Sequence, residues 1–123
     1  MLSIQSIAKT EQKAKQAAEL LWQLLKEKRQ IAQNTDTLTS IANQPERPEA
    51  VLQANYFLQQ QDRLMELHND LVNLIILFRE GAPYKTHADL QHRISEFSGM
   101  HAAVRNTYRT FLEQNQTKPY QAA

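Results

Sequence analysis

The chain has no cysteine, only two glycines and only four prolines among its 123 residues. Without cysteine, a disulfide framework, thiolate metal ligands and a cysteine nucleophile are excluded. An all-β domain needs many tight turns, and so few glycines and prolines cannot supply them. The glycine count also excludes a glycine-rich phosphate loop, and no Gly-x-Ser-x-Gly nucleophile elbow occurs. The composition therefore favours a few long helices and supports no familiar catalytic class.

Charge of one sign does not dominate either. The formal net charge is +1, and no run of like charge reaches five residues, which argues against a nucleic-acid-binding arm. The longest wholly apolar run, Leu74 to Phe78, is too short to span a membrane, and residues 1–9 lack the apolar stretch of a signal peptide. We therefore expect a single cytoplasmic domain over residues 1–123, with no membrane partner.

Three segments carry the hydrophobic spacing of helices that pack along their length. In the last segment, core-type side chains recur at alternating intervals of four and three: Leu90, Ile94, Phe97, His101, Val104, Tyr108 and Phe111. The middle segment shows the same spacing at Ala50, Ala54, Phe57, Gln61, Leu64, His68, Leu71, Ile75 and Phe78. In the first segment the stripe is Ile4, Ile7, Ala14, Ala18, Leu21, Leu25 and Ala32, widened by a flanking row at Ala17, Leu24 and Ile31. This spacing predicts an all-α antiparallel bundle of three long helices, at about residues 3–33, 48–80 and 86–115.

Local signals set the predicted boundaries. Pro48 suits a first helical turn, Gly81 suits the position just past a helix end, and Thr86 can cap the last helix. Residues 34–48 are polar and contain two prolines, so they read as a long connection that is either a simple crossover or a functional loop. From about residue 116 we expect a flexible C-terminal tail.

The middle helix ends in a segment that is apolar around nearly its whole circumference. Two neighbouring helices cannot cover such a ring, so a second copy of the chain, another protein or the 34–48 connection is expected to cover it. A small-residue patch on the last helix would allow another backbone to approach, although an ordinary exposed glycine explains it equally well. The predicted partner-binding residues are Leu71, Leu74, Ile76, Leu77, Phe78, Gly99, Ala102 and Ala103. Trp22 is either an interface anchor or a residue at the rim of the core.

Histidines are the main candidates for chemistry. His68 and His101 both fall on apolar seams, where they are either a buried acid–base pair or structural residues bonded to neighbours. His87 and His92 are five positions apart and point to different faces, and no Glu-x-x-His occurs. We therefore expect no metal and no cofactor.

Arg63 and His68 form an Arg-x4-His spacing that resembles the short motif of HEPN-type helical ribonucleases. In that family an arginine and a histidine from paired helices cleave RNA by acid–base chemistry without a metal. The resemblance covers six residues and implies these two as catalytic groups. Leu64 follows the arginine here, where the family usually carries a polar residue. The alternative is a salt-bridged Arg63 beside a structural His68.

Basic residues are numerous on the first helix, but acidic ones dilute them. The basic residues are Lys9, Lys13, Lys15, Lys26, Lys28 and Arg29, with Arg93, Arg105 and Arg109 on the last helix. Phosphate binding needs a concentrated basic surface, which Glu11, Glu19 and Glu27 interrupt. We therefore predict a non-enzymatic protein-interaction module of the adaptor, small-chaperone or inhibitor type. The alternatives are the ribonuclease and a nucleic-acid-binding accessory protein.

Overall fold

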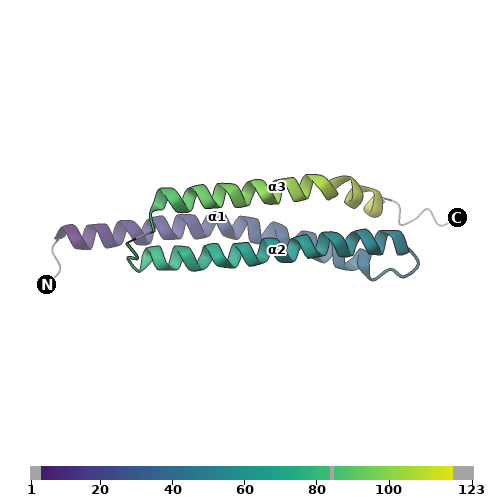
Figure 1. Ribbon diagram of the computed structural model, residues 1–123, viewed down its shortest axis with the longest axis horizontal. Helices are drawn as coiled ribbons and strands as arrows, with labels where there is room; N and C mark the ends of the chain where they lie inside the picture. The colour runs from purple at the N-terminus through teal and green to yellow at the C-terminus, as the bar shows by residue number, and fades with distance from the viewer. Residues whose placement is uncertain (1–3, 84, 118–123) are drawn as a thin grey trace.

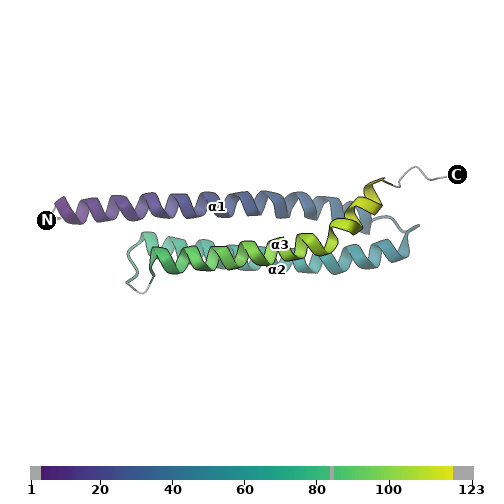
Figure 2. The same cartoon turned by 90° about the horizontal axis from the view of Figure 1, so that it is seen from above.

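The chain forms three long α-helices. The computed structural model describes residues 4–83 and 85–117, with side chains placed for 8–83 and 85–115. The helices are α1 (Ile4–Ala42), α2 (Pro48–Arg79) and α3 (His87–Thr117). Figure 1 shows α2 and α3 side by side with α1 behind them, and Figure 2 shows α1 along one side of that pair. The predicted all-α bundle of three helices is therefore confirmed.

The predicted connection at 34–48 is wrong over most of its length, because α1 continues to Ala42. Leu38 and Ile41 are buried, and they keep the segment helical by holding it against the other helices. Among its polar residues, the Thr35 hydroxyl donates to the carbonyl oxygen of Ile31 at 2.8 Å, whereas the Asn34 side-chain nitrogen is buried without a partner among the described residues. Tertiary burial thus overrides a composition that is typical of loops.

The buried face of α1 also differs from the predicted stripe. Ala14, Ala18 and Ala32 are exposed, Leu21 and Leu25 are half-buried, and the side chains of Ile4 and Ile7 lie outside the described part. The row expected as a flank, Ala17, Leu24 and Ile31, belongs to the true core face, which also includes Leu20, Leu38 and Ile41. Once the helix extends to Ala42, these residues define a longer and more strongly apolar seam.

The turn between α2 and α3 follows the sequence signals closely. Gly81 has φ +93°, a value that favours glycine, and its N–H donates to the carbonyl oxygen of Phe78. The N–H of Ala82 donates to the carbonyl oxygen of Leu77 at 3.0 Å, which completes a Schellman motif. At the start of α3, the Thr86 hydroxyl oxygen accepts a hydrogen bond from the Asp89 N–H at 3.1 Å. α2 begins at Pro48 as predicted.

Two apolar clusters make up the core. The larger one fills the half of the bundle near the α2–α3 turn, where Leu24, Ile75 and Leu90 are almost fully buried. The smaller one lies near the α1–α2 turn and includes Leu38, Phe57, Tyr108 and Phe111.

The last turns of α3 move to the side of the bundle on which α1 lies, as Figure 2 shows. The Arg47 guanidinium, which follows the end of α1, donates to the side-chain oxygens of Gln44 and Asn115 there. Gln116 and Thr117 still belong to α3, and the rest of the predicted tail, 118–123, lies outside the described residues. No described helix is long and apolar enough to cross a membrane.

Candidate protein-interaction surface

Exposed apolar side chains gather along the groove between α2 and α3. Among the described residues, five large hydrophobic side chains are exposed, and four of them lie on α2 or α3. Their exposed fractions are 72% for Leu52, 55% for Tyr56, 44% for Met100 and 38% for Leu77. We call this face, which looks away from α1 in Figure 1, the outer groove. It contains two hollows, and no residue of α1 lines either of them.

The first hollow, which we call the apolar hollow, lies near the middle of the groove. Its walls are Leu67, Leu71 and Leu74 from α2 with Phe97 and Met100 from α3, and its volume is about 210 Å³. Asp70, Arg93 and Glu96 form its charged rim. The Arg93 guanidinium is held by an ion pair with Asp89 at 3.1 Å, so the rim presents more negative than free positive charge.

The second hollow, which we call the aromatic hollow, lies between the start of α2 and the end of α3. Leu52, Tyr56, Thr107 and Phe111 line it, together with Gln53, Phe57 and Gln114, and its volume is about 490 Å³. The Phe57 ring is 5.4 Å from that of Tyr56 and 5.5 Å from that of Phe111, so aromatic contacts fix the floor. The last turns of α3, which contribute Phe111 and Gln114 to this hollow, lean toward α1 at this end of the bundle (Figure 2).

The predicted apolar ring on α2 is largely enclosed within the chain. Leu71 and Phe78 are only 7% and 3% exposed, so little of either side chain is accessible to a partner. They point into the core because α1 and α3 both pack against this part of α2. Leu74 and Ile76 are half-buried, and Leu77 is exposed. Of this predicted set, only Leu74 lines a hollow with part of its surface free.

The small residues of α3 lie on its outward face. Gly99 and Ala103 are exposed and Ala102 is half-buried. A Cβ atom added at Gly99 would meet no atom within 4 Å, so nothing in the chain uses the space that the glycine leaves. None of the three residues lines a hollow of the outer groove.

Leu52, Leu67 and Met100 are not among the residues that the sequence predicts for this surface, and Tyr56 is ambiguous there between an interface anchor and a residue at the rim of the core. A signal was present, because Leu52, Tyr56, Leu67, Leu74 and Leu77 share one face of α2 at helical spacing. Gln60, Arg63 and Asp70 interrupt this row, so it is weaker than the core seam and was not recognised.

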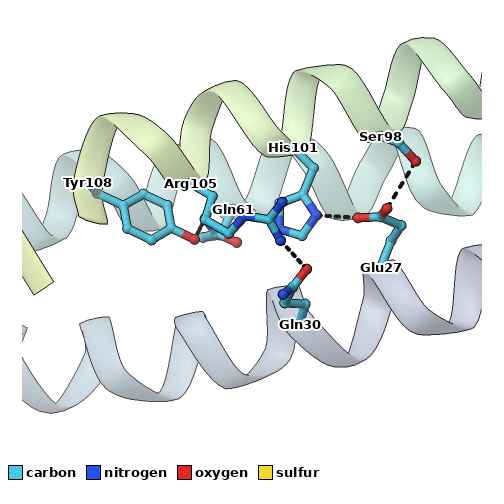
Figure 3. A network of polar contacts seen from close by, with 7 residues as sticks. All are labelled: Glu27, Gln30, Gln61, Ser98, His101, Arg105 and Tyr108. Atoms are coloured by element: carbon cyan, nitrogen blue, oxygen red, sulfur yellow. Dashed lines mark hydrogen bonds and ion pairs between the residues drawn. The ribbon is translucent and has the colours of Figure 1, made fainter. Parts of the chain in front are cut away.

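A buried polar cluster links all three helices, as shown in Figure 3. His101 is fully buried, and its Nδ1 contacts the Glu27 carboxylate, which also accepts a hydrogen bond from the Ser98 hydroxyl at 2.9 Å. One helical turn further along, Arg105 donates to the side-chain oxygen of Gln30 on α1. These pairs join α3 to α1 at fixed heights, which sets the register of the two helices.

On the α2 side of the cluster, the Gln61 amide donates to the Tyr108 hydroxyl at 3.2 Å. Burial raises the pKa of the Tyr108 phenol above its ordinary value of 10.0, while the Gln61 hydrogen bond and the Arg105 charge act in the opposite direction. His101 Nε2 and Gln61 Oε1 are buried without a hydrogen-bond partner among the described residues. Each such atom costs about 1–3 kcal/mol, which offsets part of the stability that the hydrogen bonds of the cluster contribute.

The two seam histidines do not form a pair. His68 is 5% exposed, packs its ring 6.2 Å from that of Phe97, and places Nδ1 3.4 Å from the side-chain oxygen of Asn69. His101 contacts Glu27 instead. Each imidazole is therefore bonded to a different neighbour.

Arg63 and His68 point in different directions from α2. Arg63 is exposed and His68 is buried, as expected from a separation of five residues, or about 140° around the helix. Within one chain the two side chains therefore do not share a cleft. Among the described residues, no group of three or more acidic, histidine or cysteine side chains is placed to hold a metal ion.

The basic side chains of α1 are spread over its surface. Lys13 lies over the ring of Phe78, with its Nζ 5.7 Å from the ring centre, and Arg29 lies 6.0 Å from the ring of Trp22. Trp22 is 56% exposed, so it is not a residue at the rim of the core.

Comparisons with protein-family models, with curated proteins and with solved structures found no match to this chain.

Proposed function

We propose that the chain is a non-enzymatic protein-interaction module that holds an amphipathic helix of a partner in the outer groove. The observation that carries the proposal is that four of the five exposed large hydrophobic side chains lie along the α2–α3 pair, opposite α1. Two packed helices present two grooves, and here α1 fills only one of them. A helix laid in the other would complete a four-helix bundle.

Burial of the exposed apolar side chains supplies the energetic gain on binding. Complete burial of one large apolar side chain is worth about 1.5–3 kcal/mol before the costs of association are subtracted. Leu52 and Tyr56 are more than half exposed, and Met100 is slightly less than half exposed. Leu67 and Leu74 are partly exposed. A partner helix with apolar residues at intervals of three and four would cover all of them. The absence of cysteine suits a reducing compartment, and we include a cytoplasmic location in the proposal.

Cross-linking tests where a partner binds. Because the chain has no cysteine, one introduced cysteine gives a unique attachment point for a cross-linker. Gln53→Cys places it at the exposed edge of the aromatic hollow, and Asn106→Cys places it on an exposed position of α3 that lines neither hollow. In extracts of the source cell, we expect the first variant to cross-link a partner and the second one not to.

A charge variant provides the second arm of this test. The Tyr56→Glu/Met100→Glu double variant introduces carboxylates at two exposed positions of the outer groove and should lose the partner. Asn106→Glu carries the same kind of change at the control position and should retain it. Equal recovery of every bound protein by the double variant and by wild type would contradict the proposal.

A further inference from the structure

We infer that the helix that enters the outer groove is α1 of a second copy of this chain, through its outward face around Trp22. This inference rests on the proposed function of the outer groove and names its occupant. The described surface has one exposed large hydrophobic residue outside α2 and α3, and that residue is Trp22. The exposed large hydrophobic side chains thus lie on the outer groove and on α1, and α1 runs along one side of the α2–α3 pair (Figure 2).

The outward face of α1 has the form of an inserting helix. Ala14, Ala18, Trp22 and Leu25 recur at intervals of four, four and three, and none of the four is fully buried. This is the anchor spacing of a helix that binds in a groove between two other helices. The small side chain of Ala18, one turn before Trp22, would let the backbone come close enough for the indole to enter a hollow. We call this face the α1 ridge.

Charge selects the apolar hollow as the position of Trp22. Lys15, Lys26 and Arg29 surround the indole, with Glu19 as the acidic member of the group. The rim of the apolar hollow carries the complementary charge: it holds the carboxylates of Asp70 and Glu96, while Arg93 is paired with Asp89. Glu96 also contacts the exposed His92 at 2.6 Å. The aromatic hollow has only glutamine and threonine as polar lining, so it offers the basic flank of the ridge no partner.

The contact that results is heterologous, since it joins two different faces. Each copy presents one α1 ridge and one outer groove, and no residue of α1 lines the hollows of that groove, so a docked pair still has one of each free. Association therefore continues beyond two copies, into a closed ring or an open fibre. A two-fold dimer of groove against groove would leave the α1 ridge exposed and would place two acidic rims together.

The test uses two variants of the full chain that each remove one face. Trp22→Glu disables the α1 ridge and Met100→Glu disables the outer groove, and both residues are substantially exposed, so the fold is preserved. Asn106→Glu is the control for the added charge. The mass of each protein is measured by analytical ultracentrifugation over a range of concentrations, and circular dichroism confirms that each variant is folded.

Wild type and Asn106→Glu should exceed the monomer mass of 14.3 kDa as concentration rises, and each face variant alone should stay at it. An equimolar mixture of the two face variants should reach twice the monomer mass and stop, since only one intact ridge and one intact groove remain. A monomeric wild type, self-association that survives either face variant, or a mixture that stays monomeric would each overturn the inference.

These outcomes separate the inference from the proposed function. Trp22→Glu keeps the outer groove intact, so it should still cross-link a foreign partner through Gln53→Cys if the groove serves one. If the wild type is monomeric but still cross-links to a foreign partner, the result contradicts the self-association and leaves the proposed function intact. If the chain self-associates through the groove but cross-links only to copies of itself, the result contradicts binding of a foreign partner and leaves the self-association intact.

Discussion

The contact between Glu27 and His101 permits a quantitative test of the buried polar cluster. His101 is fully buried, and its Nδ1 has Glu27 as partner while its Nε2 has none among the described residues. Glu27→Leu would leave both ring nitrogens unpaired, which should cost about 1–3 kcal/mol of the free energy of unfolding. His101→Phe should cost less, because the Glu27 side chain is 22% exposed to water and still accepts the hydrogen bond from Ser98.

The double variant distinguishes a specific pair from two independent residues. Glu27→Leu/His101→Phe removes both polar groups and leaves apolar side chains in their place, so it should be less destabilised than the sum of the two single variants, by about 1–2 kcal/mol. Urea unfolding followed by circular dichroism gives the four free energies. For a chain of this size, 1 kcal/mol corresponds to a shift of roughly 4 °C in Tm. Strict additivity, or a neutral Glu27→Leu, would refute the argument.

Two further predictions concern single positions. Burial raises the pKa of Tyr108 above 10.0, so the folded chain holds the phenol proton more tightly than the unfolded chain does. The free energy of unfolding is therefore fully retained below pH 10 and falls as the pH rises through the folded-state pKa of this phenol. Tyr108→Phe should therefore flatten the alkaline loss of stability, measured by urea unfolding at several pH values; an unchanged slope would contradict the stated cause. Gly81→Ala should destabilise by about 1 kcal/mol, because φ is +93° there, whereas Gly99→Ala should stabilise by about 0.5–1 kcal/mol in an open helical position. Thermal unfolding of both variants checks the opposite signs.

Much of the fold follows from the sequence because the core seams of the second and third helices are long and regular. Every member of the predicted seam from Ala54 to Phe78 is buried, including the polar Gln61 and His68. The cap at Thr86 and the Gly81 turn were also predictable, since each depends on one residue type in one local geometry. Local signals of this kind do not require knowledge of the partner helices.

The end of α1 could not be predicted from composition. Residues 34–42 carry threonine, asparagine and serine, and only their contacts with α2 and α3 make them helical. A helix that ended near residue 33 would lack Leu38 and Ile41 in its hydrophobic seam. Without these two residues, the sequence favours the weaker row through Ala14 and Ala18 as the core face.

The exposed apolar side chains do not lie where the sequence places them. The apolar ring from Leu71 to Phe78 was expected to exceed what two helices can cover, yet Leu71, Ile75 and Phe78 are enclosed and Val72 packs against the core. What the sequence could not reveal was the path of α3, which leans toward α1 and uncovers Leu52 and Tyr56 at the other end of α2. Exposure at those two positions depends on the direction of a neighbouring helix, which no local pattern encodes.

An odd number of antiparallel helices also has a mechanical consequence. α1 begins at one end of the rod and α3 finishes at the opposite one (Figure 1), and α1 alone, with its 39 residues, is about 58 Å long. Tension applied between the two extremities would pull parallel to the helix axes. Separation would then require the helices to slide past one another against interlocked side chains over most of their length, rather than to peel apart one contact at a time. The three-helix rod should therefore resist extension under tension, and it would keep whatever is attached at its two ends at a fixed distance.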